Sequence, residues 1–211
     1  MTEISPVFDE TYHIYLDRIA GLDFTLLEKN LEVSIEEDEV IVPFFGKPYH
    51  VSAKGIVDLS GKKPLLQVCV VLCNYLILCK DFYLIGDEWV AYRDFKDSGP
   101  LTSYFPNAVE KPIARQFSGK LRELEKSCIA HGGFPPDIEI SYELSMKFNP
   151  LPKVPMLLLY NDADEEFPAH CSLLFEKHAD KYLDAESLAI LGMILSTYLR
   201  KSITSEHVAL D

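Results

Sequence analysis

The sequence has few positive charges. Its 211 residues include 20 lysines and arginines against 33 aspartates and glutamates, which gives a formal net charge of −13 and an isoelectric point near 4.9. Nucleic acids and anionic membrane surfaces attract basic proteins, so this balance argues against both as partners. The acidity suits a protein that stays in solution or that complements a basic partner.

The sequence also lacks the segments that would target it to a membrane or anchor it there. The N-terminus, MTEISPVFDE, has neither a basic region nor an apolar core, so no signal peptide is expected. The longest apolar stretch, residues 65–79, is shorter than the ~20 residues that cross a bilayer, and it is interpreted as a buried helix. Five cysteines without a secretory signal indicate reduced thiols and a cytoplasmic location.

Familiar catalytic and metal-binding motifs are absent as well. The chain contains no GxSxG, HExxH, P-loop or GxGxxG pattern. Cys69 and Cys73 share a helix face, but their CxxxC spacing favours a core role over a metal site. His170 and Cys171 are neighbours in an expected strand, so their side chains point to opposite faces. The motifs therefore leave open whether the protein is an enzyme.

The hydrophobic pattern predicts an α+β fold. We expect a single domain over residues 1–211, in which a mostly antiparallel sheet packs against a buried central helix and amphipathic helices. Its parts would be an N-terminal helical segment (1–30), an α+β core (31–202) and a flexible tail (203–211). Gly21 and Asp23 predict a break in the helical segment and a new helix cap.

Within the core, changes of period predict the order of the elements. The expected elements are strands over 31–36, 39–45, 49–51 and 55–58, a helix over 65–79, an amphipathic helix over 107–130 interrupted near 118–119, a strand over 137–148, a hairpin over 154–175 and a helix over 184–201. The first four strands would form a small antiparallel meander. His131 follows the amphipathic helix and is interpreted as a helix-end cation or cap, with a ligand role beside Cys128 as the alternative.

The hairpin is the most informative stretch, and the fold is expected to be organised around it. Two apolar runs flank a turn with four carboxylates, Asp162, Asp164, Glu165 and Glu166. Asp162 and Asp164 would face one side in extended backbone, so the cluster could bind a hard cation. The alternative is a solvated turn, in which aspartate side chains bond to their own backbone.

A second candidate site lies within residues 80–106. The only tryptophan, Trp89, stands four residues before Arg93, and Tyr92 and Asp94 lie beside them. An arginine among aromatic residues can form a clamp for an anionic ligand. It can also form a fixed ion pair, here with Asp94 or with the carboxylates of the hairpin. The candidate ligand-binding residues are therefore Trp89, Tyr92, Arg93 and Asp94.

Four segments resemble a bacterial and archaeal family called domain of unknown function 3786. They are VPFFGKPYHV (42–51), GDEWVAYRDF (86–95), LPKVPMLLLYNDADEEFPA (151–169) and LFEKHADKYLDAESLAILG (174–192), and the resemblance runs from about residue 40 to 199. Members usually carry GEW and an FRE-like triplet, where this chain has GDEW and YRDF. Some relatives have a preceding iron–sulfur module, which is not expected here because no cysteine precedes Cys69. The resemblance implies a fold and an anaerobic, cofactor-related setting, but no activity.

Two functions fit these observations. The favoured one is a non-catalytic ligand-binding or accessory module, with a pocket formed by the Trp89–Asp94 segment and the acidic hairpin. The alternative is a metal-assisted hydrolase that uses the 162–166 carboxylates as metal ligands or general base. The cofactor is unknown, the partner is an unknown small ligand or protein, and a symmetric homodimer is open.

Overall fold

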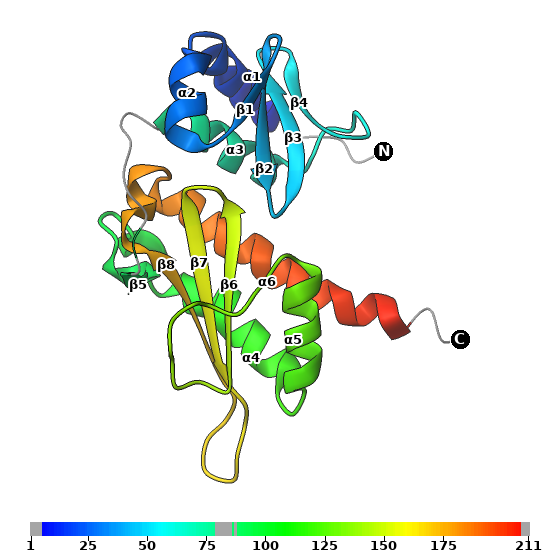
Figure 1. Ribbon diagram of the computed structural model, residues 1–211, viewed down its shortest axis with the longest axis vertical. Helices are drawn as coiled ribbons and strands as arrows, with labels where there is room; N and C mark the ends of the chain where they lie inside the picture. The colour runs from blue at the N-terminus through cyan, green and yellow to red at the C-terminus, as the bar shows by residue number, and fades with distance from the viewer. Residues whose placement is uncertain (1–5, 79–85, 87, 208–211) are drawn as a thin grey trace.

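Two four-stranded antiparallel sheets and six α-helices make up the part of the chain that the structure describes. The structure is a computed structural model, and it describes residues 6–78, 86 and 88–207. Figure 1 shows the two sheets in separate lobes, one formed by residues 6–78 and the other by residues 88–207. The fold class is α+β with antiparallel sheets, as the sequence predicted.

The N-terminal lobe, residues 6–78, contains the predicted meander. Its strands follow one another in the order β1-β2-β3-β4, and a helical hairpin precedes them. Asp23 accepts the Thr25 N–H and caps the second helix, as expected. The elements are α1 (Pro6–Ala20), α2 (Phe24–Leu31), β1 (Ser34–Glu36), β2 (Glu39–Phe44), β3 (Lys47–Ser52), β4 (Gly55–Asp58) and α3 (Leu66–Leu78).

The C-terminal lobe, residues 88–207, is organised around the predicted hairpin, whose strands occupy the centre of the order β5-β8-β7-β6. Figure 1 shows α6 passing behind this sheet. The strands are β5 (Trp89–Ala91), β6 (Leu144–Leu151), β7 (Val154–Asn161) and β8 (His170–Glu176). The helices are α4 (Lys111–Phe117), α5 (Leu121–Ala130) and α6 (Ala185–His207), with short helical turns at Tyr92–Asp94, Gly99–Leu101, Pro106–Glu110 and Lys177–Lys181.

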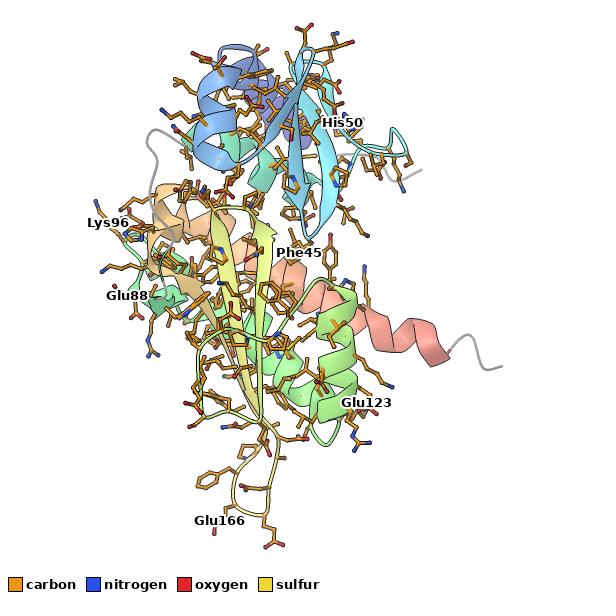
Figure 2. The ribbon with its side chains drawn as sticks, viewed as in Figure 1. Phe45, His50, Glu88, Lys96, Glu123 and Glu166 are labelled. Carbon is orange, nitrogen blue, oxygen red and sulfur yellow. The ribbon has the colours of Figure 1, made fainter. Side chains whose placement is uncertain are left out.

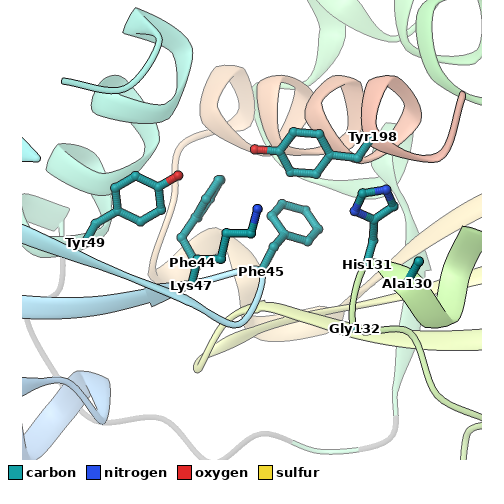
Figure 3. Close-up of a pocket in the computed structure, with 8 residues that line it drawn as sticks. All are labelled: Phe44, Phe45, Lys47, Tyr49, Ala130, His131, Gly132 and Tyr198. Atoms are coloured by element: carbon teal, nitrogen blue, oxygen red, sulfur yellow. The ribbon is translucent and has the colours of Figure 1, made fainter. Parts of the chain in front are cut away.

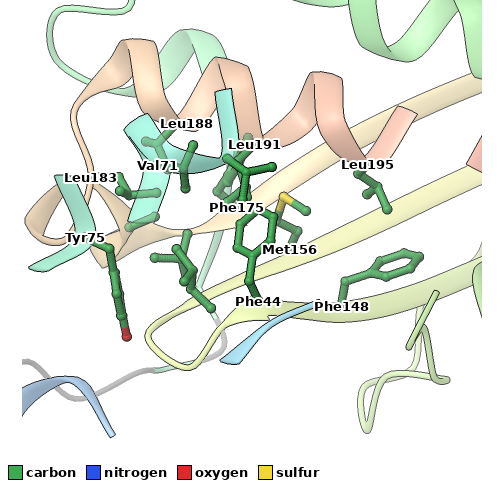
Figure 4. Packing of buried hydrophobic residues seen from close by; sticks show 14 of the residues in the cluster. Phe44, Val71, Tyr75, Phe148, Met156, Phe175, Leu183, Leu188, Leu191 and Leu195 are labelled. Atoms are coloured by element: carbon green, nitrogen blue, oxygen red, sulfur yellow. The ribbon is translucent and has the colours of Figure 1, made fainter. Parts of the chain in front are cut away.

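One hydrophobic core runs through both lobes. Figure 4 shows Phe44 and Val71 of the N-terminal lobe against Met156, Phe175 and Leu191 of the C-terminal lobe, and all five side chains are buried. Hydrogen bonds and an ion pair also connect the two lobes. They are Phe45 N–H to Pro150 O (2.9 Å), Asn74 Nδ2 to Ser187 Oγ (2.9 Å), Lys153 N–H to Tyr75 Oη (3.2 Å) and the Lys153–Glu32 ion pair. The lobes are therefore packed and hydrogen-bonded to each other.

The predicted strand over 137–148 is wrong in its first half. Strand β6 begins only at Leu144, and residues 137–143 make no ladder. Figure 1 shows this segment crossing the face of the sheet that lies away from α6. Ile138 and Ile140 are half-buried while their neighbours are exposed. The alternation therefore arises from extended backbone with one side against the protein, which gives the same period of two as a strand.

Other boundaries also differ from the prediction. The helix over 107–130 is interrupted at 118–119 as predicted, between α4 and α5, where Gly119 has a φ of +73°, but its start was not predicted to be the π-helical turn at Pro106–Glu110. Helix α6 continues through His207, past the predicted end at Lys201 and into the segment expected to be a tail. Strand β5 was not predicted, and Cys79 lies outside the described residues. Among the helices that the structure describes, none combines the length and the apolar character that a bilayer crossing requires.

Candidate functional site

The structure does not bring the side chains of Trp89, Tyr92, Arg93 and Asp94 together. Trp89 is half-buried, while Tyr92 is buried, stacks on Phe105 with ring centroids 4.4 Å apart, and donates its hydroxyl to the Ala185 carbonyl (2.9 Å). The Arg93 side chain is 74% exposed, and its Nε lies 3.9 Å from Asp94 Oδ1. Of the partners considered for a fixed ion pair of Arg93, Asp94 is the one nearby, but the pair is exposed, and an exposed pair of this kind contributes little stability.

Strand geometry explains why Trp89 and Tyr92 diverge. Trp89 pairs with Glu176, Val90 pairs with Phe175, and successive side chains point to opposite faces. Trp89 therefore lies on the face away from α6, where Lys147 Nζ is 5.6 Å from its ring centroid. Its indole Nε1 is buried and has no hydrogen-bond partner among the described residues. Asp94 Oδ2 accepts the Ala91 N–H (3.0 Å) and thereby closes the turn after β5.

The carboxylates Asp162 and Asp164 accept hydrogen bonds from nearby backbone groups. Asp162 Oδ1 accepts the N–H groups of Gly119 (2.7 Å) and Ala163 (2.8 Å). Asp164 Oδ1 accepts the Glu166 N–H (2.8 Å) and the Phe167 N–H (2.7 Å). The Phe167 and Glu166 N–H groups lower the pKa of Asp164. This is the geometry of a solvated turn closed by aspartate side chains.

The two predicted clusters also lie apart from each other. Figure 2 shows Glu88, next to Trp89 in the sequence, beside β5, and Glu166 at the far tip of the β7–β8 loop, where Glu165 and Glu166 are exposed. Within the described residues, no group of three or more histidine, cysteine, aspartate or glutamate side chains is arranged to hold a metal ion. The metal assignment for Asp162, Asp164, Glu165 and Glu166 stays a prediction.

A pocket lies instead where the two lobes meet. Its volume is about 200 Å³, and both lobes contribute to its lining. The residues come from the β2–β3 hairpin, from the end of α5 and from α6, and Figure 3 shows them around one space: Phe44, Phe45, Lys47, Tyr49, Ala130, His131, Gly132 and Tyr198. We call this site the hairpin-tip pocket. Among the lining residues, the sequence analysis considered a ligand role only for His131, as an alternative, and it did not predict the pocket.

The tip of the hairpin has an unusual local sequence. Phe45 and Gly46 are the two turn residues, with φ of +48° and +73°, the signs that a type I′ turn requires. Asparagine-glycine is favoured there, because a bulky residue with positive φ costs about 1 kcal/mol or more. The Phe45 ring packs edge-on against Phe44 and Tyr198, with centroids 5.0 and 5.3 Å away. A phenylalanine before a hairpin glycine is the signal that could have identified this site.

The polar ends of three side chains converge on the pocket. Figure 3 shows the hydroxyls of Tyr49 and Tyr198 pointing toward each other and the Lys47 ammonium group below the Tyr198 ring. The pKa of Tyr198 is raised, first by burial and then by the proximity of Tyr49. Burial likewise raises the pKa of Tyr49. Both phenols are therefore protonated at neutral pH and can donate hydrogen bonds.

His131 completes the lining. It is the C-cap of α5, which confirms the predicted cap, but its interpretation as a cation needs correction. Its ring stacks on Tyr198 at 5.4 Å with an interplanar angle of 23°. Burial lowers the pKa of His131, and the charge of Lys47 lowers it further, although a hydrogen bond with the Tyr198 backbone opposes the shift. The imidazole is thus neutral near pH 7. Burial also raises the pKa of Cys128 to about 12, so that thiol is not a ready metal ligand.

Comparison with models of known protein families identifies the family of the chain. Residues 23–198 match the family model described as "Domain of unknown function (DUF3786)". The chain belongs to this family. The match confirms the resemblance drawn from the four sequence segments, and it begins before the first of them. In this DUF3786 chain the first segment, residues 42–51, forms the hairpin of the pocket. No curated protein and no solved structure matches the chain.

Proposed function

We propose that the protein is a non-catalytic module that binds a small ligand in the hairpin-tip pocket. The observation that carries this proposal is Phe45, a bulky residue with a φ of +48° whose ring contacts Tyr198 of the opposite lobe. Such conformations persist where the surrounding structure requires them, and they cluster at binding sites. The accessory role in an anaerobic, cofactor-related setting rests on the family resemblance alone.

The composition of the pocket supports binding more than catalysis. Its lining combines four aromatic rings with Lys47 and a neutral His131. Ligand sites in proteins share this plan of apolar walls with a few polar groups that fix orientation. Hydrolases commonly use a serine, cysteine or threonine nucleophile with an adjacent base, or two carboxylates in different environments, and the lining contains none of these residue types. The alternative of a metal-assisted hydrolase at residues 162–166 has no geometric support in the described residues.

A fragment screen tests the proposal directly. The ¹H–¹⁵N NMR spectrum of the whole chain would be recorded with a set of one-ring and two-ring aromatic fragments. Ala130 is exposed and lines the pocket, so Ala130→Phe fills the space without removing core packing. The matched control is Ile129→Phe, because Ile129 is its exposed neighbour on α5 and does not line the pocket.

We expect several fragments to shift the signals of pocket residues in the wild type and in Ile129→Phe, and to lose this effect in Ala130→Phe. The proposal fails if no fragment shifts those signals, or if the filled variant responds as strongly as the control. Native mass spectrometry of protein purified from its own host under anaerobic conditions would complement the screen, because a stoichiometric extra mass reports a ligand that survives purification.

A further inference from the structure

Deepening the proposed function, on which this inference rests, we infer that the ligand is a small aromatic carboxylate with one ring. Three features of the hairpin-tip pocket point to it: one ammonium group without a carboxylate beside it, phenol groups that can donate hydrogen bonds, and flat aromatic walls around a small volume. Each feature constrains a different property of the ligand, namely its charge, its acceptor atoms and its shape.

The charge of the lining is opposite to that of the protein as a whole. The chain has 33 acidic residues against 20 basic ones, yet no aspartate or glutamate lines the pocket. The Lys47 side chain makes no ion pair or hydrogen bond with another described residue. Lys153 and Lys177, by contrast, each pair with a glutamate. Lys47 is therefore available to a ligand, and its charge, which also lowers the pKa of His131, favours an anion there.

The donors are placed to receive a carboxylate. The Tyr49 hydroxyl makes no hydrogen bond with a described residue, although the tyrosine is only 9% exposed. It points toward the Tyr198 hydroxyl across the top of the pocket, with the Lys47 ammonium group below the Tyr198 ring (Figure 3). A carboxylate has two oxygens with about four acceptor positions and no donor. It can accept from the ammonium group and from a phenol at once, and hydrogen bonds to an ionised acceptor are stronger than neutral ones.

The shape and size of the pocket select a flat, small molecule. The Tyr198 ring contacts the rings of Phe45 and His131, and an aromatic ligand can stack or pack edge-on against them. A cavity of about 150 Å³ binds benzene, so a volume of about 200 Å³ suits one ring with a carboxylate. Drug-sized ligands occupy roughly 300–1,000 Å³. A nucleotide-sized cofactor is therefore too large for this pocket.

Two features oppose an anion: the negative charge of Asp58, which acts on the Tyr49 hydroxyl, and the carbonyls at the C-terminus of helix α5, which carry partial negative charge. Here those carbonyls already accept hydrogen bonds. Cys128 O accepts the N–H groups of His131 (3.1 Å) and Gly133 (2.8 Å), and Ile129 O accepts the Gly132 N–H (3.1 Å). These bonds cap the helix and reduce the opposing potential of its end, and Lys47 is the one lysine, arginine, aspartate or glutamate in the lining.

The test compares benzoate with benzamide, which has the same ring and nearly the same size but no charge. Dissociation constants would be measured from the NMR shifts of pocket residues in the whole chain. Benzoate has few atoms, so we expect a dissociation constant on the order of 1 mM. Benzamide should bind at least roughly tenfold more weakly. Lys47→Gln should weaken benzoate by roughly tenfold and leave benzamide unchanged, and Tyr49→Phe should weaken benzoate by roughly fivefold.

Lys54→Gln is the matched control, since Lys54 is exposed on the turn between β3 and β4, outside the pocket. It should leave the affinity for benzoate unchanged. Equal binding of benzoate and benzamide, or unchanged benzoate binding in Lys47→Gln, would overturn the inference that the ligand is a carboxylate. If neutral fragments bind the pocket and benzoate does not, the ligand class is wrong and the proposed binding function stands. If no fragment binds in the pocket at all, both the ligand class and the proposed binding function are wrong.

Discussion

Replacing Phe45 by asparagine separates the cost of its backbone from the contribution of its ring. Phe45 has a φ of +48° and occupies the first turn position, where asparagine is favoured. Relieving the left-handed strain should stabilise the protein by about 1 kcal/mol. The ring is half-buried and makes two edge-to-face contacts. Because the ring is only half-buried, removing it costs about 1–1.5 kcal/mol of hydrophobic stabilisation. The two ring contacts contribute about 0.5–1.5 kcal/mol each.

The packing loss therefore exceeds the strain relief, and Phe45→Asn should lower the free energy of unfolding by about 1–3 kcal/mol. Urea unfolding followed by circular dichroism measures this, with the m-value as a check that unfolding stays two-state. Glu37→Asn is the matched control, because Glu37 has a φ of +52° and is exposed. It should be neutral or stabilising. If both variants change stability equally, the Phe45 ring does not hold the hairpin tip, and the reasoning is refuted.

Three further perturbations test the packing and the protonation states. The pKa of His131 is lowered in the folded state, so the free energy of unfolding should fall as pH drops from about 6.5 toward that pKa. His131→Gln removes this titration. Urea titrations should therefore show that the variant loses less stability than the wild type between about pH 7.5 and 5.5. In Gly192→Ala the new Cβ would lie 2.7 Å from Phe105 Cε2, so we expect a net loss of about 1–3 kcal/mol despite better helix propensity, and equal or higher stability would contradict the contact. Burial raises the pKa of Cys171 and Cys128, so Ellman's reagent at about pH 8 should label these thiols only after denaturant is added, and fast labelling in the native protein would contradict their burial.

The parts of the fold that follow from local pattern were predictable. The Asp23 cap, the four-strand meander and the β7–β8 hairpin each have a signal within a few residues, and the structure contains all three. The first half of the strand expected over 137–148 was wrong for a physical reason, because an extended segment lying against the protein alternates as a strand does. Strand β5 was missed since three residues are too few to show a period.

The candidate site was harder to predict, because it depends on contacts between distant residues. Trp89 and Arg93 are close in sequence, but the strand directs Trp89 to one face, and the following turn leaves Arg93 exposed. Lys47, His131 and Tyr198 are far apart in sequence and meet only because the hairpin of one lobe packs beside α5 and α6 of the other. Residue types near one another along the chain therefore identified candidate chemistry, but they could not show which side chains share a pocket.

Two residues with left-handed backbone connect the pocket to the junction between the lobes. Glu32 and Phe45 both have positive φ without being glycine, and both extend a side chain to the opposite lobe. Glu32 pairs with Lys153, which is only 4% exposed, and Phe45 packs on Tyr198. Glycine would suit either backbone better, but it has no side chain to make the contact. The strain at these two positions thus marks where the lobes are held together. Because Phe45 also lines the pocket, a ligand bound there contacts the same residue that joins the lobes, and its binding energy should stabilise their packing.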